Sequence, residues 1–110
     1  MKDLISFAEF AKIDLRVGKV VEAKIPEGSE HLIELRVSFG EEGERTIFAG
    51  IKQWYLSDEL KGKKLVFVLN MAPKKTPFGE SEGMLLAVDG GEGKPLVIEV
   101  DQAEEGAKLR

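Results

Sequence analysis

Cysteine is absent from the 110-residue sequence, and histidine occurs once, as His31. Disulfide bonds, cysteine nucleophiles and thiolate metal sites are therefore excluded, and the usual sets of transition-metal ligands cannot be assembled. No uninterrupted apolar run exceeds five residues, whereas a membrane-spanning helix needs about 20. Asp3 and Glu9 interrupt the apolar residues at the N-terminus, so we expect no secretory signal. A cytoplasmic protein without a membrane partner is the expectation.

Catalytic patterns are missing as well. The sequence has no glycine-rich phosphate loop of the Walker or dinucleotide type. His31 stands beside Ser29 and Glu30 at the start of a predicted strand, where a solvated side chain is expected. The carboxylates of Glu104 and Glu105 lie in a polar tail. We therefore expect a non-catalytic chain that uses no metal and no other cofactor.

The residues that are present favour one folded domain over residues 1–110. Hydrophobic residues make up 43% of the chain and charged residues 33%, as in folded, soluble proteins. The net charge of −4 is unevenly distributed. Five lysines and no acid occur between Leu60 and Gly79, whereas eight acids and three bases follow from Glu80 to Arg110. The basic stretch could face a phosphate backbone or form a solvated surface.

A short helix is predicted near the N-terminus. Ser6 and Glu9 have the spacing of a capping box, and Ile5 and Phe10 that of a hydrophobic staple. The helix should end near Ile13, where the apolar spacing changes from helical to alternating. Its apolar face should lie on the domain or on a partner.

Alternation of apolar and polar residues then predicts a series of strands. The first is long and contains a glycine, which is typical of a strand that bends at a barrel corner. A helical segment interrupts the series, and a long polar loop precedes the fifth strand. The predicted elements are strands at 15–25, 31–39 and 45–49, a helical insert within 50–62, a strand at 64–70, a loop at 71–83, a strand at 84–88 and a last short strand at 96–100. Five strands with a helical insert between the third and the fourth predict an all-β OB-fold barrel.

Three stretches resemble the tRNA-binding domain family, and the similarity extends from about residue 7 to residue 110. The pattern Asn…Lys-Lys…Gly-x-Ser-x-Gly-Met is far more specific than a lone glycine motif. The family includes the C-terminal domain of bacterial methionyl-tRNA synthetases, the separate archaeal β subunit, a small stand-alone bacterial tRNA-binding protein and an endothelial-monocyte-activating cytokine precursor. The stretches that carry the resemblance are FAKIDLRVG (10–18), the Gly-Ile pair in RTIFAGI (45–51), and NMAPKK (70–75) followed by GESEGM (79–84).

The resemblance implies an OB-fold that binds tRNA at the outer corner of its L shape with little sequence preference. It also implies a homodimer that serves as the β subunit or C-terminal domain of methionyl-tRNA synthetase, beside a catalytic part that aminoacylates. A stand-alone tRNA-binding protein is the alternative. A small bacterial export chaperone of the same fold ranks third, because that group usually lacks the Gly83-Met84 pair and has a shortened N-terminal helix.

Polar residues in and near the predicted loop are the candidate RNA contacts. Lys74 and Lys75 could reach phosphates, Asn70 a base edge or a 2′-hydroxyl, and Met84 could place its thioether on a base or sugar. Ser81 could bind a phosphate or brace its own loop. Five further basic residues could extend the track: Arg16, Arg36, Arg45, Lys63 and Lys64.

Each candidate has a structural alternative. Asn70 could be a turn former, and Met84 could pack beneath the loop. Arg16, Arg36 and Arg45 could pair with Glu22, Glu34 and Glu44, respectively. Trp54 and Phe78 could stack on bases, but core or interface packing is the preferred interpretation for both.

Overall fold

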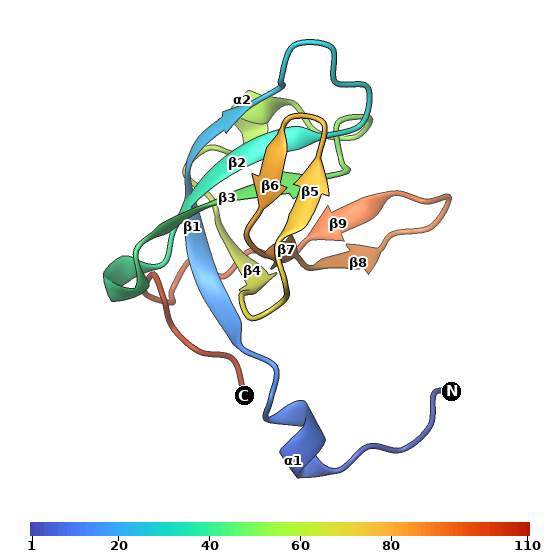
Figure 1. Ribbon diagram of the computed structural model, residues 1–110, viewed down its shortest axis with the longest axis vertical. Helices are drawn as coiled ribbons and strands as arrows, with labels where there is room; N and C mark the ends of the chain where they lie inside the picture. Colours follow the sequence, from blue (N-terminus) through green and yellow to red (C-terminus); the bar gives the residue numbers. More distant parts are fainter.

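Strands form most of the regular structure in the computed structural model, which describes residues 1–110 (Figure 1). Only two short α-helices occur, and neither is long or apolar enough to cross a membrane. The elements are α1 (Phe7–Phe10), β1 (Leu15–Lys24), β2 (Ile33–Ser38), a 3₁₀ turn (Gly40–Glu42), β3 (Glu44–Ala49), α2 (Ser57–Leu60), β4 (Lys64–Val68), β5 (Lys74–Thr76), β6 (Gly79–Ser81), β7 (Met84–Leu85), β8 (Ala87–Asp89) and β9 (Pro95–Val97).

The main sheet has five antiparallel strands in the order β3-β2-β1-β4-β7. Its two edges meet where the segment before β7 lies along β3. The Glu82 amide donates to the Thr46 carbonyl (2.8 Å), the Thr46 amide donates to Glu82 Oε1 (3.0 Å), and the Phe48 amide donates to Ser81 Oγ (3.0 Å). These bonds nearly close the sheet into a barrel, which confirms the predicted OB-fold.

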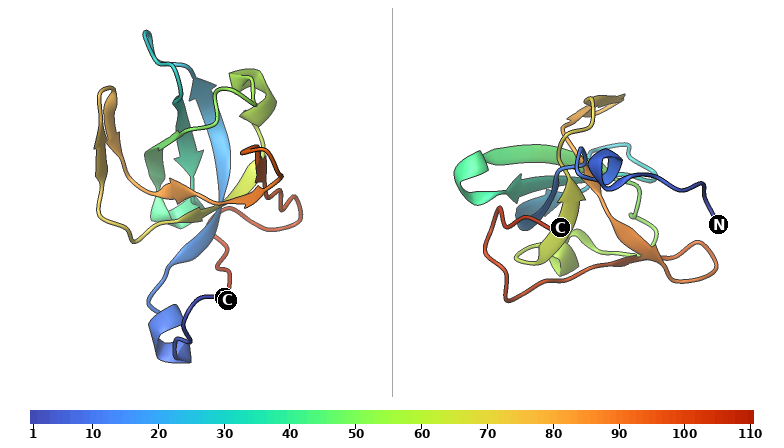
Figure 2. Two further views of the ribbon diagram at one scale, coloured as in Figure 1. Left: turned by 90° about the vertical axis from the view of Figure 1, so that its right-hand side faces the viewer. Right: turned by 90° about the horizontal axis from the view of Figure 1, so that it is seen from below.

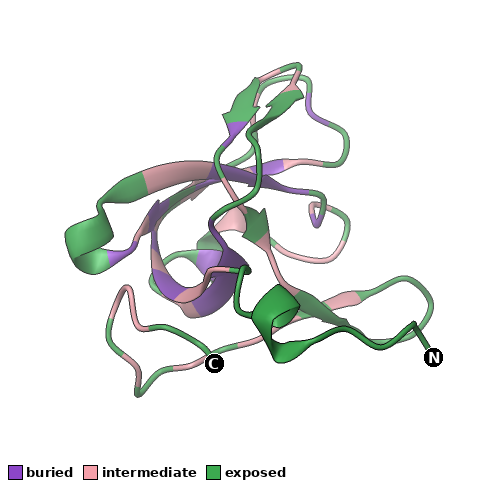
Figure 3. Cartoon of the chain, turned by 60° about the horizontal axis from the view of Figure 1, so that its bottom comes forward, coloured by how far each residue is buried: buried purple, intermediate pink, exposed green.

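The core fills the inside of this barrel (Figure 3). Ile33, Leu35 and Val37 of β2 are fully buried, as their alternation with polar residues predicted. Phe39 and Phe67 meet edge to face, with ring centroids 5.5 Å apart. The region 50–62 contains α2, so the helical insert between the third and fourth barrel strands is confirmed as well.

The long first strand departs from strict alternation at a β-bulge. The register with β2 shifts between Val20 and Glu22, so that Val21 is the extra residue and Val20 points into the core. The apolar residues at odd positions between 15 and 25 predict one inward face that includes Val21. That prediction was wrong, because a bulge moves the following side chains by one position. Gly18 lies just before it, where a Cβ would stand 2.5 Å from the Phe39 ring. A strand that bends around the barrel needs both features.

The expected polar loop at 71–83 is instead a β-hairpin made of β5 and β6 (Figure 1). The expected strand at 84–88 is divided: β7 pairs with β4, and β8 pairs with β9 in a second hairpin. The last strand covers 95–97 and lies outside the main sheet. Both hairpins consist of runs of only three residues, which is too short for alternation to define a strand.

The N-terminal helix has the predicted capping box, with Ser6 N to Glu9 Oε1 at 3.0 Å and Glu9 N to Ser6 Oγ at 3.1 Å. α1 projects from the barrel and has no buried residue (Figure 1). Phe7 is 85% exposed and Ile5 60%. Its apolar face therefore does not lie on the domain.

The C-terminal segment runs along β1. The Val17 amide donates to the Ala107 carbonyl, and the Leu109 amide donates to the Leu15 carbonyl, both at 2.9 Å. Ser38 Oγ donates to Glu105 Oε2 at 2.7 Å. Backbone and side-chain hydrogen bonds thus hold the last residues of the chain on the barrel.

Candidate nucleic-acid interface

The hairpin β5–β6 presents two lysines to solvent. Its turn is Pro77-Phe78, and Thr76 Oγ1 holds it by donating to the Gly79 carbonyl at 2.7 Å. Lys74 and Lys75 are exposed, and neither has a carboxylate oxygen within 4.0 Å. Both ammonium groups are therefore available to an anionic ligand.

A hollow of about 420 Å³ lies beside these lysines. Met84 is 42% exposed in it and Met71 50%, whereas Phe48 is 9% exposed. The hollow is lined by Leu32, Phe48, Gly50, Met71, Ala72, Lys74, Lys75, Thr76, Pro77, Ser81, Gly83 and Met84. An apolar surface thus lies next to a cationic one, a combination that suits the bases and phosphates of a nucleic acid.

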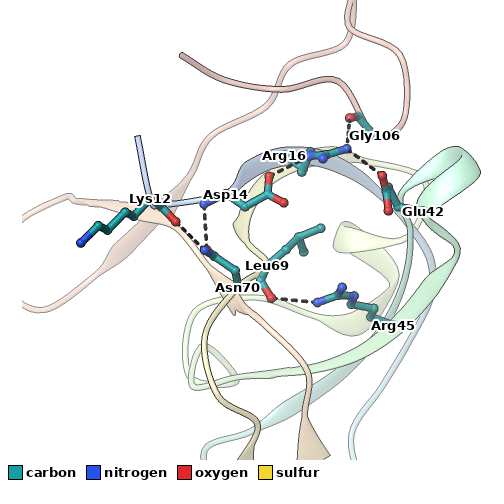
Figure 4. A network of polar contacts seen from close by, with 8 residues as sticks. All are labelled: Lys12, Asp14, Arg16, Glu42, Arg45, Leu69, Asn70 and Gly106. Atoms are coloured by element: carbon teal, nitrogen blue, oxygen red, sulfur yellow. Dashed lines mark hydrogen bonds and ion pairs between the residues drawn. The ribbon is translucent and has the colours of Figure 1, made fainter. Parts of the chain in front are cut away.

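The side-chain amide of Asn70 is engaged with the backbone (Figure 4). Oδ1 accepts from the Asp14 amide at 2.7 Å, and Nδ2 donates to the Lys12 carbonyl. Asn70 therefore fixes the connection between α1 and β1 to the end of β4. A second hydrogen and a second lone pair of this amide stay free for another partner.

Ser81 is only 5% exposed. Its hydroxyl accepts from the Phe48 amide and donates to the Gly83 carbonyl, each at 3.0 Å. These contacts close the barrel on β3 and already use the hydrogen of the hydroxyl, although Ser81 also lines the hollow. We therefore assign Ser81 a structural role and leave it out of the candidate interface.

Arg16 is also engaged within the chain, and its side chain is 12% exposed (Figure 4). Nε lies 2.7 Å from Asp14 Oδ1, and Nη1 lies 3.5 Å from Glu42 Oε1 and 3.2 Å from the Gly106 carbonyl. The hydrogen bond to Asp14 is the main cause that raises the pKa of Arg16, and burial opposes it. The guanidinium stays charged and links the C-terminal segment to β1.

The other two arginines also differ from their expected partners. Arg36 Nε contacts Glu44 Oε1 at 2.9 Å. Arg45 Nη1 donates to the carbonyls of Leu69 (2.8 Å) and Glu82 (3.2 Å) and so supports the closure of the barrel. The pairs weighed as an alternative to RNA contact, Arg16 with Glu22, Arg36 with Glu34 and Arg45 with Glu44, therefore do not form, although Arg36 does pair with an acid. Thr46 is directly opposite Arg36 in the β2–β3 ladder and Glu44 is its diagonal neighbour, so cross-strand register determines the pairing of Arg36.

The predicted basic stretch is divided between two sides of the molecule. Lys63 Nζ lies 3.5 Å from Glu99 Oε1, and Lys64 Nζ donates to the Ala103 carbonyl at 2.8 Å. Both follow α2, which lies on the opposite side of the barrel from the β5–β6 hairpin (Figure 2, left). Lys63 and Lys64 thus brace the C-terminal segment and do not continue the surface of Lys74 and Lys75.

The sequence interpretation missed the turn that presents the lysines. Thr76-Pro77-Phe78-Gly79 has proline at the second and glycine at the fourth position, a signature of a tight turn. Phe48 and Met71 were not proposed as RNA contacts either, although the alternating pattern placed Phe48 near the end of a predicted strand. The proline and glycine of this turn were thus the sequence feature from which the hairpin could have been predicted.

Comparisons with known proteins agree with this geometry. The family described as "Putative tRNA binding domain" matches residues 15–108. The methionine–tRNA ligase of Paraburkholderia xenovorans is 48% identical over 112 residues, which is 97% of this chain but 16% of that protein. The chain thus spans about a sixth of the length of that relative.

Two solved structures are similar over nearly the whole chain. The crystal structure of a MetRS-related protein from Pyrococcus horikoshii has a TM-score of 0.93 and 38% identity, covering 99% of this chain and 100% of that one. The chaperone CsaA from Bacillus anthracis has a TM-score of 0.87 and 28% identity, with coverage of 98% and 100%. The family match and the barrel geometry together place this chain in the tRNA-binding domain family, as a domain of the type found in methionyl-tRNA synthetases.

Proposed function

We propose that this domain binds tRNA by its shape, with Lys74 and Lys75 on phosphates and Met84 against a base or sugar. The observation that carries the proposal is the pair of exposed, unpaired lysines on a rigid hairpin beside an apolar hollow. Phosphate contacts carry no sequence information, so binding should tolerate different tRNA sequences. Asn70 is included in this RNA-binding surface because of its position and because its amide keeps a free hydrogen and a free lone pair.

Substitution of the hairpin lysines tests this surface. Lys74→Ala and Lys75→Ala should each weaken all tRNAs about equally and reduce the slope of log K against log salt by roughly 0.7–0.9, the value for one lost phosphate contact. Met84→Ala should weaken binding with little change in slope, because methionine carries no charge. Filter-binding titrations at several salt concentrations measure both quantities.

Lys61→Ala is the matched control. It removes the same charge from a lysine that pairs with Glu22 at 3.2 Å, next to α2 on the opposite side of the barrel. Its affinity and salt slope should equal those of the parent. A salt slope that changes as much for Lys61→Ala as for Lys74→Ala contradicts the assignment of the surface.

Shape recognition has its own test. Unrelated elongator tRNAs should bind within about tenfold of each other, a spread of ~1.4 kcal/mol. A linear RNA of equal length should bind much more weakly. Equal affinity for the linear RNA would falsify recognition by shape.

A subunit or domain of methionyl-tRNA synthetase is the proposed setting, because the relatives named as ligases contain the matching region. The domain would add binding energy while a catalytic part aminoacylates in the cytoplasm. Co-purification of the domain with a separately expressed catalytic part tests a β subunit. A stand-alone tRNA-binding protein is the alternative, and it predicts tRNA binding without such a complex.

We also propose that two copies associate through α1. Phe7 and Phe10 are exposed, and they border a hollow of about 370 Å³ between α1 and the C-terminal segment that also includes Ile13 and Leu109. An isolated surface this apolar is unfavourable in water. A second copy would cover it with an interface of at least roughly 1,000 Å² in total.

Light scattering measures the mass of the assembly at micromolar concentration. The parent should have twice the monomer mass of 12.1 kDa, and Phe7→Asp should shift it toward the monomer. Leu56→Asp is the control, since Leu56 is a similarly exposed apolar residue outside this hollow. A parent mass at the monomer value refutes the dimer.

A further inference from the structure

A second hollow adjoins the one beside the lysine hairpin. It has a volume of about 340 Å³, and seven of its ten lining residues are hydrophobic, among them Trp54, Leu85 and Ala87. Phe48 and Met84 line both hollows. The two hollows therefore adjoin at these residues, and together, as the groove, they reach from the β5–β6 hairpin to the β8–β9 hairpin.

Positive charge lines one end of this groove and lies close to the other. Lys74 and Lys75 line its first hollow. Lys94 itself lines, with Asp89, a neighbouring hollow that shares Gly93 and Pro95 with the second hollow, and Lys94 is exposed without a carboxylate oxygen within 4.0 Å. An apolar floor with lysines lining one end and a further lysine near the other is complementary to a chain that alternates phosphates with flat bases.

The groove is less suited to an extended peptide. A peptide would add to a free strand edge. β7 borders both hollows through Met84, and β3 borders both through Phe48. The amides of Thr46 and Phe48 on the β3 edge already donate to Glu82 and Ser81. Main-chain pairing at these positions is therefore blocked, whereas stacking on an aromatic ring needs no strand edge.

We propose that an unstacked nucleobase of the bound tRNA lies in the second hollow, against Trp54 and Met84. Lys94 and the hairpin lysines then hold the phosphates on either side of it. Trp54 supplies the aromatic face, since its side chain is only partly buried and lies among apolar neighbours. This inference rests on the proposed tRNA binding and adds the kind of nucleotide contact and the residue that makes it.

The chain offers a direct readout, because Trp54 is its only tryptophan. Stacking of a base on the indole should quench its fluorescence, and the quenching should follow the same isotherm as filter binding of the same tRNA. A blunt RNA duplex without unpaired bases should quench much less at equal occupancy.

Variants separate stacking from folding. Trp54→Ala should weaken tRNA binding by between about 5-fold and 150-fold, the range for loss of one stacked base, without a change in salt slope. Trp54→Phe should restore most of the affinity, because it keeps an aromatic face. Leu56→Ala, an exposed apolar residue outside the groove, should bind like the parent. Thermal melts of each variant give the folded fraction.

The outcomes distinguish this inference from the function on which it rests. If filter binding shows tRNA bound while Trp54 fluorescence is unchanged, the base contact is overturned and tRNA binding stands. Equal affinity of a folded Trp54→Ala variant overturns it as well. Absence of any tRNA binding by the parent removes the proposed function itself. Quenching by an apolar unfolded peptide but not by tRNA would assign the groove to a polypeptide and overturn the inference.

Discussion

Replacement of Ser81 by alanine distinguishes a structural residue from an RNA contact. Ser81 Oγ holds the Phe48 amide and the Gly83 carbonyl at 3.0 Å each in a site that is 5% exposed. Alanine removes the acceptor and leaves a buried backbone N–H without a partner, which costs about 1–3 kcal/mol. For a domain of about this size each kcal/mol shifts Tm by roughly 4–8 °C. We therefore expect Tm to fall by roughly 5–20 °C.

Glu82 should keep the barrel closed in this variant, because it bonds Thr46 through both its side chain and its backbone. The variant should thus fold at low temperature. Once the folded fraction is taken into account, its tRNA affinity and salt slope should equal those of the parent. Ser57→Ala is the control, since the Ser57 hydroxyl lies in α2 away from this closure; its Tm should change little.

Calorimetry or circular dichroism gives Tm, and filter binding at a temperature well below it gives the affinity. A Ser81→Ala protein that melts like the parent but binds tRNA at least tenfold more weakly refutes the structural assignment. The hydroxyl would then contact RNA, and the hairpin would have to open when tRNA binds.

Two further substitutions test how the ends of the chain are attached. Asn70→Ala should release the connection between α1 and β1, and each lost hydrogen bond should reduce the stability by about 0.5–1.5 kcal/mol. Hydrogen exchange of the Asp14 amide should then accelerate, and unchanged exchange contradicts the role of the Asn70 side chain. Gly106→Ala should detach the C-terminal segment, because Gly106 has a φ of 86° and an added Cβ would lie 2.3 Å from the Phe39 carbonyl oxygen. Limited proteolysis should then cleave that segment first, and a resistant variant argues against the contact.

The barrel was largely predictable because its strands repeat a pattern. In β2 three inward apolar residues alternate with polar ones, so pattern and burial agree along the whole strand. The capping box of Ser6 and Glu9 was predictable for a similar reason, since both partners lie within one turn. The bulge at Val21 was not, because the extra residue depends on the register of a partner strand distant in sequence.

The candidate site was predictable in part. The resemblance identified Lys74, Lys75 and Met84, which the structure brings together around one hollow. Ser81 and Arg16 have the residue types of RNA contacts but are held in part by groups far away in sequence, at Phe48 and Gly106. No local pattern encodes such partners. Residue type therefore suggests an RNA contact, but only the folded structure shows whether the polar atoms of that residue are free to bind RNA.

Net charge is a poor guide to binding in this chain for the same reason. The total of −4 includes acids that neutralise lysines elsewhere, as Glu22 does for Lys61 and Glu99 for Lys63. Screening limits the reach of exposed charges to about 8 Å at physiological salt, so distant acids repel a bound phosphate only weakly. The lysines of the β5–β6 hairpin have no such partner. A chain that is acidic as a whole can thus present a basic contact, and its affinity for tRNA should depend on salt according to the few phosphates it meets rather than according to its total charge.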